Sequence, residues 1–191
     1  SDVCSSDLTV AAAPEWRLGM AEDEQAVLLR LLDRRADPRR EAAWRLLAVL
    51  WQGAYYQALR VEQGLGYALF SRFHAGEDAA ELQFGVQSPH APVERLREAI
   101  QGFLARAVAE LPATSPARLQ QARRAVLDGL ADPGTRQARL LRTCHAWLAA
   151  QPAGWAEEVR QAAQGLQLAD LADAAAALLG AATLRCWVSS T

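Results

Sequence analysis

The chain has 191 residues, of which 51% are hydrophobic and 22% are charged, and these values are typical of a single globular domain. Its formal net charge of −2 argues against nucleic acid or an anionic membrane as the main partner. No apolar run approaches the roughly 18 residues that a membrane-spanning helix needs.

The N-terminal segment differs in character from the rest of the chain. Residues 1–8 read SDVCSSDL, which can be back-translated into a common sequencing-adapter sequence. We therefore expect residues 1–8 to be an adapter artefact and the gene to be truncated upstream. Residues 9–23 are expected to be a linker or the end of a preceding domain, and residues 24–191 to form one domain. Since no export signal is visible, a bacterial cytoplasmic location is expected.

The three cysteines are Cys4, Cys144 and Cys186, and their spacing fits no metal-binding motif. An odd number also cannot form a complete set of disulfides, so we expect buried free thiols in a reducing compartment. A chain of this size can bury roughly 70% of its surface without cross-links.

The first predicted elements are a strand and a helix. Residues 24–34 are apolar at nearly every position, which fits a strand buried on both faces, although periodicity alone also allows a helix. Asp37 can cap a following helix, and Pro38 suits its first position. Apolar residues then recur at helical spacing, and the helix is expected to end within residues 56–60.

A β-hairpin is predicted next. Residues 67–74 alternate weakly between apolar and polar, and residues 80–88 alternate cleanly. The sequence AGED between them supplies turn residues. In the second strand Leu82, Phe84 and Val86 share one face, and the opposite face, with Glu81, Gln83 and Gln87, is expected to be solvated.

The remaining chain is mostly helical. A helix with a continuous apolar stripe opens at Pro92, a second begins at Ser115–Pro116, and DPG at residues 132–134 ends it. Further helices are expected at 136–149, 155–164 and 168–179, and a last strand at 183–190. The first of these helices carries Leu141, Cys144, His145 and Leu148 along one side. The predicted fold is α+β, an open and mostly antiparallel sheet with a β-α-β-β-α-β core, helices on one face and extra helices before the last strand.

The segment LRVEQGLGY, residues 59–67, follows the first helix, and LQFGVQSPHAP, residues 82–92, leads into the second. With this order of elements, both segments resemble the insulinase/pitrilysin family of zinc metallopeptidases, the inverzincins. The likeness is to the last domain of the C-terminal half, covers roughly residues 24–190, and implies a metallopeptidase-like two-layer sandwich. Val61 and Gly64 depart from the residues usual in the family.

The resemblance implies four homologous domains, whose two halves close around an extended peptide. It also implies a zinc ion bound by H-x-x-E-H in the first domain, outside this chain. His74, His90 and His145 do not have that spacing, so no metal is expected here and this chain alone should be inactive. His74 is interpreted as a polar residue of the hairpin turn, His90 as a surface residue and His145 as a core or second-layer residue.

Arg60 and Tyr67 are the candidate site residues. In the family the matching side chains reach the peptide, and a tyrosine hydroxyl could donate to the carbonyl oxygen that gains negative charge during hydrolysis. From the residues alone, Arg60 could equally be a basic residue at a helix C-terminus, and Tyr67 a half-buried strand aromatic. Gly64 and Gly66 are expected to form the bend between them by adopting backbone angles that other residues resist.

Two functions therefore remain open. In the first, the chain is the substrate-clamping domain of an active zinc endopeptidase, with the N-terminal half of the same peptidase and an extended peptide as partners. The FGVQSP strand end resembles members that act in quinone cofactor synthesis. In the second, it belongs to a non-catalytic structural or partner subunit of the same family. An H-x-x-E-H motif in the upstream reading frame would distinguish the two.

Overall fold

A single sheet organises the part of the chain that the computed structural model describes, namely residues 14–18, 24–34, 37–75, 80–131, 134–148, 151–180 and 183–190. Its strands run in the order β1-β5-β2-β4-β3. β1 and β5 are parallel, and every other neighbouring pair is antiparallel. Their bounds are β1 Glu15–Leu18, β2 Gln25–Asp33, β3 Ala68–Ala75, β4 Ala80–Ser88 and β5 Leu184–Ser190.

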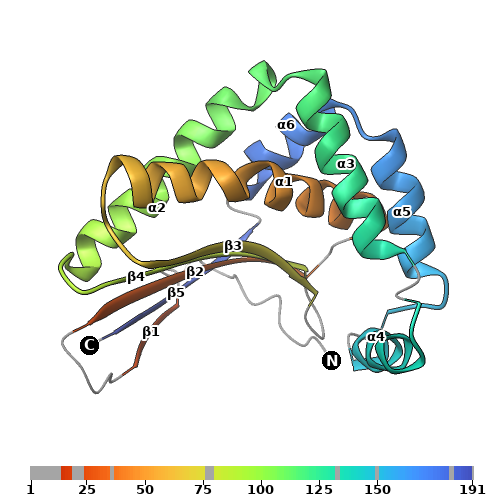
Figure 1. Cartoon of the computed structure of the whole chain (residues 1–191), viewed down its shortest axis with the longest axis horizontal. Helices are drawn as coiled ribbons and strands as arrows, with labels where there is room; N and C mark the ends of the chain where they lie inside the picture. The colour runs from red at the N-terminus through yellow and green to blue at the C-terminus, as the bar shows by residue number, and fades with distance from the viewer. Residues whose placement is uncertain are drawn as a thin grey trace, which may run out of the picture.

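All the described helices except α4 lie on one side of this sheet, as Figure 1 shows. α1 and α2 contact the strands directly, and α3, α5 and α6 pack against α1. Their bounds are α1 Pro38–Tyr56, α2 Val93–Glu110, α3 Pro116–Leu130, α4 Arg136–Leu148, α5 Trp155–Gly165 and α6 Leu168–Leu178, with a π-helical turn η1 Gln57–Glu62 and a 3-10 turn η2 Leu111–Ala113. The expected α+β class with an open, mostly antiparallel sheet is confirmed.

Local signals set the ends of these helices. Asp37 accepts a hydrogen bond from the Arg40 amide at 2.8 Å, and Ser115 accepts one from the Arg118 amide at 3.3 Å. Each caps an end at which a proline occupies the first turn. None of the described helices is both long enough and apolar enough to cross a membrane.

The core lies between the sheet and α1. Tyr55 of α1 packs edge-on against Phe84 of β4 at 5.5 Å and against Phe103 of α2 at 5.1 Å between ring centroids. Its hydroxyl donates to the Gly85 carbonyl at 3.2 Å, and burial raises the pKa of this phenol. The buried aromatics thus fix α1 and α2 over the middle of the sheet.

Two predictions about the sheet faces were wrong. Glu81 and Gln83 on β4 were expected to be solvated but are buried, because β4 is a central strand and Arg30 and Arg72 from the flanking strands cover them. The β2 strand is confirmed, but it was expected to be buried on both faces. Its residues alternate between buried and half-buried, since no helix lies on the second face.

α4 departs from the expectation that the helices lie on one face of the sheet. In Figure 1 it lies at the lower right, below α3 and α5 rather than over the sheet. Leu141 is 52% exposed and Trp147 is 79% exposed. Cys144 on this helix is exposed, so its predicted burial was wrong, whereas Cys186 of β5 is buried as expected. Cys4 and the side chain of His145 lie outside the described residues.

β1 was not predicted as a strand. It falls within residues 9–23, the stretch expected to be a linker or the end of a preceding domain, and it pairs with β5 from Glu15↔Trp187 to Leu18↔Ser190. Four residues are too few to show a period-2 pattern, so sequence alone gave no signal for this edge strand.

Candidate functional site

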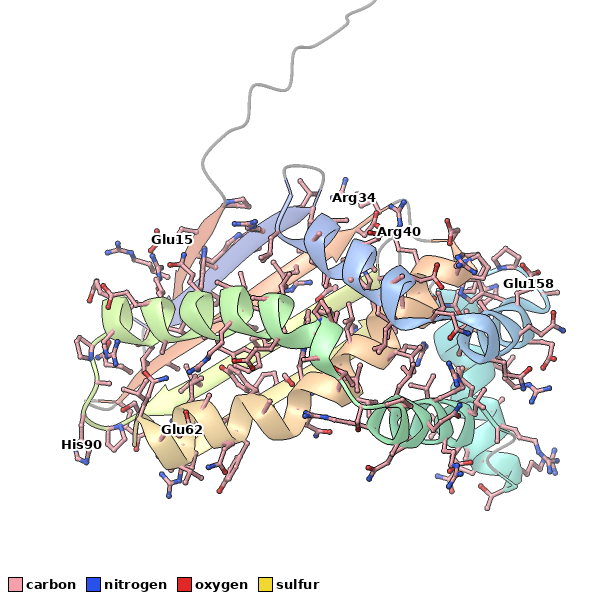
Figure 2. The ribbon with its side chains drawn as sticks, turned by 90° about the horizontal axis from the view of Figure 1, so that it is seen from above. Glu15, Arg34, Arg40, Glu62, His90 and Glu158 are labelled. Atoms are coloured by element: carbon pink, nitrogen blue, oxygen red, sulfur yellow. The ribbon has the colours of Figure 1, made fainter. Side chains whose placement is uncertain are left out.

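The candidate site lies at one end of the sheet, where β3 begins, β4 ends and β2 begins. Two residues labelled in Figure 2 mark this end of the sheet. Glu62 is the last residue of η1, which leads into β3, and His90 follows the end of β4. We call the corner formed by Glu24, Arg60, Gly66, Tyr67 and Gln87 the β3 corner.

Arg60 is positioned by an irregular helix end. α1 ends at Tyr56, within the expected residues 56–60, and the chain then continues as the π-helical turn η1 through Glu62. Ala58 and Leu59 anchor this turn in the core, whereas Arg60 is exposed. Turns of this type are rare and are often found at functional sites. Sequence reasoning missed η1, because its composition does not differ from that of an α-helix.

The Arg60 guanidinium donates a hydrogen bond to the carbonyl oxygen of Gly66. A second contact closes the same turn, since the Leu65 amide donates to the Leu59 carbonyl at 2.9 Å. Arg60 is therefore held against the residue that precedes Tyr67. The structure brings the two predicted site residues to one corner, from the end of a helix and the start of a strand.

The two glycines serve this corner in different ways. Gly64 has a φ of +63°, a left-handed conformation that favours glycine. Gly66 was expected to behave similarly, but it is not among the described glycines with positive φ. Instead, a Cβ atom at Gly66 would lie 2.4 Å from the carbonyl oxygen of Gln87. Its requirement for glycine is therefore close backbone packing against β4.

Tyr67 is fixed at both its backbone and its hydroxyl. Its amide donates to the Gln87 carbonyl at 3.1 Å, and its hydroxyl donates to Oε2 of Glu24 at 2.6 Å. The Gln87 side-chain amide donates to the same Glu24 oxygen. The residue as a whole is 49% exposed, so the hydroxyl is fixed by a contact that lies at the surface.

Sequence reasoning did not identify Glu24 or Gln87 as part of the site. Glu24 immediately precedes β2, and Gln87 is near the end of β4. The register places Ala26 opposite Gln87 and Gln87 opposite Ala68, so the three strand ends meet at one level. The strand order was needed to see this, since 43 residues separate Glu24 from Tyr67.

A cleft with a volume of about 470 Å³ is lined by residues that include Gln25, the sequence neighbour of Glu24, together with His90, Arg97 and Ser189. Arg97 of α2 pairs with Glu15 at 2.5 Å and donates to the Ser189 hydroxyl at 3.3 Å. The hydrogen bond from Arg97 is the main reason why the pKa of Glu15 is lowered. These contacts attach β1 and β5 to the start of α2.

The described residues do not fit a zinc site. Within the described ranges, no group of three His, Cys, Asp or Glu side chains is arranged to hold a metal ion. His74 lies in β3 rather than in the turn to which it was assigned, and it is exposed there. His90 is at the surface, as expected.

Solved structures identify the class of the fold. The chain is similar to pitrilysin with a TM-score of 0.76 and 20% identity, over 93% of this chain and 19% of that one. It is also similar to a protease from Helicobacter pylori (TM-score 0.74, 14% identity, 94% and 44% covered) and to a peptidase M16 inactive domain from Pseudomonas fluorescens (0.69, 18%, 93% and 43%). The fold is that of an M16 peptidase domain.

Within this class, the family can be named. The chain belongs to the family described as PQQ synthase PqqF-like, C-terminal lobe domain 4, whose model matches residues 46–147. It is 42% identical over 145 residues to coenzyme PQQ synthesis protein F of Pseudomonas aeruginosa, which covers 74% of this chain and 18% of that relative. The same protein of Pseudomonas syringae pv. tomato is 41% identical over 104 residues, with 51% and 13% covered. The chain thus spans less than a fifth of these relatives.

Proposed function

We propose that this chain is the substrate-contacting domain of a zinc metalloendopeptidase that cleaves a peptide during pyrroloquinoline quinone synthesis. The observation that carries the proposal is the β3 corner, where Arg60 is held by the Gly66 carbonyl and Tyr67 by Glu24 at the same end of the sheet. Membership of the PqqF-like family supports the pathway, and the M16 fold supports the reaction class.

The chemistry of the two side chains agrees with this role. Peptide hydrolysis places negative charge on the scissile carbonyl oxygen, and a fixed donor near that oxygen stabilises the transition state more than the ground state. The Tyr67 hydroxyl is a neutral donor on a rigid ring, and Arg60 offers several donors for other substrate carbonyls. Tyr67 is therefore proposed as the oxyanion or carbonyl donor, and Arg60 as a substrate-binding residue.

Zinc belongs to another part of the parent protein in this proposal, since the described residues do not fit it. The zinc ion would supply a nucleophilic water, held by an H-x-x-E-H motif in the N-terminal half. That half is the proposed partner of this domain, and an extended peptide between the two is the proposed ligand. The location proposed for the parent protein is the bacterial cytoplasm.

A second function is a non-catalytic subunit that supports an active peptidase. The specific observation in its favour is the similarity to the M16 inactive domain from Pseudomonas fluorescens. Sequencing the reading frame upstream separates the two functions, because only the first requires an H-x-x-E-H motif there.

Replacing Tyr67 by Phe in the full-length parent protein tests the proposed role directly. Loss of one oxyanion donor should lower kcat for peptide cleavage by roughly ten- to a thousandfold. Tyr56→Phe is the matched control, because Tyr56 lies at the end of α1 and is similarly exposed, 51% against 49%. Unchanged cleavage by the Tyr67→Phe protein would refute the assignment.

A further inference from the structure

We infer that Glu24 holds the Tyr67 hydroxyl in the free protein and competes for it with a bound peptide carbonyl, to which the hydroxyl must turn. The inference rests on the proposed function, because it concerns the same hydroxyl. It adds a competition within the site: while the phenol donates its proton to the Glu24 carboxylate, it cannot donate that proton to the substrate oxygen.

The geometry of Glu24 supports this role. Its Oε2 atom lies 2.6 Å from the Tyr67 hydroxyl and also accepts a hydrogen bond from the Gln87 side chain. Gln87 lies in β4 and Tyr67 immediately precedes β3, and the β2–β4 register, with Gln25 opposite Ser88, sets the level of Glu24. The contact between Glu24 and Tyr67 thus depends on the pairing of the strands that these two residues adjoin.

The electrostatics explain why the contact is strong. Glu24 forms no ion pair within the described part of the chain, where its hydrogen-bond donors are Tyr67 and Gln87. Hydrogen bonds to a charged carboxylate are shorter and stronger than those to a neutral carbonyl. The Tyr67 hydroxyl should therefore prefer the Glu24 carboxylate to a neutral peptide carbonyl. This preference should weaken when negative charge develops on the carbonyl oxygen.

Each hydrogen bond that Tyr67 and Glu24 lose when substrate binds can be replaced by another. A phenol has one proton to donate, so Tyr67 cannot donate to Glu24 and to the substrate oxygen at the same time. When the hydroxyl turns to the substrate, Gln87 still donates to Oε2. Glu24 is only half-buried, so water can replace the lost donor. The cost of release is therefore limited, and the hydroxyl remains available for substrate.

Glu24→Ala and Glu24→Gln in the full-length parent protein, each alone and combined with Tyr67→Phe, test the inference. With Tyr67 present, Glu24→Ala should raise kcat/KM for peptide cleavage by about three- to tenfold, because the hydroxyl no longer has to leave a carboxylate. Glu24→Gln keeps a weaker, neutral acceptor and should give a smaller rise. In the Tyr67→Phe background, neither change should have any effect. Glu110→Ala, which removes an exposed carboxylate at the end of α2, should leave kcat/KM unchanged.

The outcomes separate this inference from the proposed function. If Tyr67→Phe lowers turnover but Glu24→Ala leaves kcat/KM unchanged or reduces it, Glu24 does not compete for the hydroxyl and the inference is wrong. A rise that persists in the Tyr67→Phe background would also overturn it, since the effect would not act through the phenol. If Tyr67→Phe itself has no effect on turnover, the proposed function fails, and the inference fails with it. Thermal unfolding of the Glu24 variants shows whether a loss is one of folding.

Discussion

At the scale of single residues, the most informative positions are polar groups on the sheet whose partners are distant in sequence. Glu81 accepts hydrogen bonds from Arg30 at 3.0 Å and from Gln83 at 2.8 Å, although alternation alone would place it in water. Burial by itself would raise the pKa of Glu81, but these donors outweigh it and hold the pKa below the ordinary value of 4.5.

Because the pKa of Glu81 is lowered, the free energy of unfolding of the chain is predicted to depend on pH. A carboxyl whose pKa is depressed by folding contributes stability above its unfolded pKa, and that contribution is lost as pH falls through the folded pKa. The free energy of unfolding of the chain should therefore decrease below about pH 4.5, and Glu81→Gln should flatten this dependence. Urea unfolding of both proteins across this range measures it.

Glu157→Gln is the control for Glu81. The pKa of Glu157 is also lowered, chiefly by its hydrogen bond with Arg160, but this pair is exposed and solvent screens it. The Glu157 variant should therefore keep most of the pH dependence. An equal slope in the wild type and in Glu81→Gln would contradict the assigned role of Glu81.

At the scale of elements, a buried arginine joins two helices. Arg123 of α3 donates from Nε to the Ala163 carbonyl at 3.0 Å and from a terminal nitrogen to the Leu166 carbonyl at 2.7 Å. These carbonyls lie at the C-terminal end of α5, where the last acceptors of a helix lack partners within it. Arg123 thus both caps α5 and fixes it against α3.

Replacing Arg123 by Met should lower the free energy of unfolding by about 1.5–3 kcal/mol, the range for hydrogen bonds to a charged group. The neighbouring Arg124 is exposed, so Arg124→Met serves as the control and should change stability by less than about 0.5 kcal/mol. Urea unfolding of the two variants measures the difference. Equal stability of the two would mean that the α3–α5 contact does not depend on this side chain.

The helices could largely be predicted from the sequence, and most of their ends lie close to the expected positions. Their signals are local: Asp37 and Ser115 are caps, and proline follows each of them. The π-helical form of η1 could not be predicted, because it depends on how Ala58 and Leu59 fit into the core. The exposure of α4 could not be predicted either, since an apolar stripe does not reveal whether another element lies against it.

At the scale of the whole molecule, strand order was the missing information. The hairpin and the α+β class could be predicted, because alternation and turn residues are local properties. The strand order β1-β5-β2-β4-β3 determines which sheet positions are buried and which strand ends meet. The family resemblance of residues 59–67 nominated Arg60 and Tyr67, whereas the contact of Glu24 with Tyr67 requires the placement of β2 beside β4.

The central claim is that a peptide contacts the β3 corner, and photo-cross-linking tests it most directly. The full-length parent protein would carry p-benzoylphenylalanine in place of Tyr67, with the same change at Tyr56 as the control, and would be irradiated with a labelled peptide substrate. We predict a cross-link from position 67 that excess unlabelled peptide abolishes, and none from position 56. No cross-link from position 67, or equal cross-linking from both positions, would contradict the account.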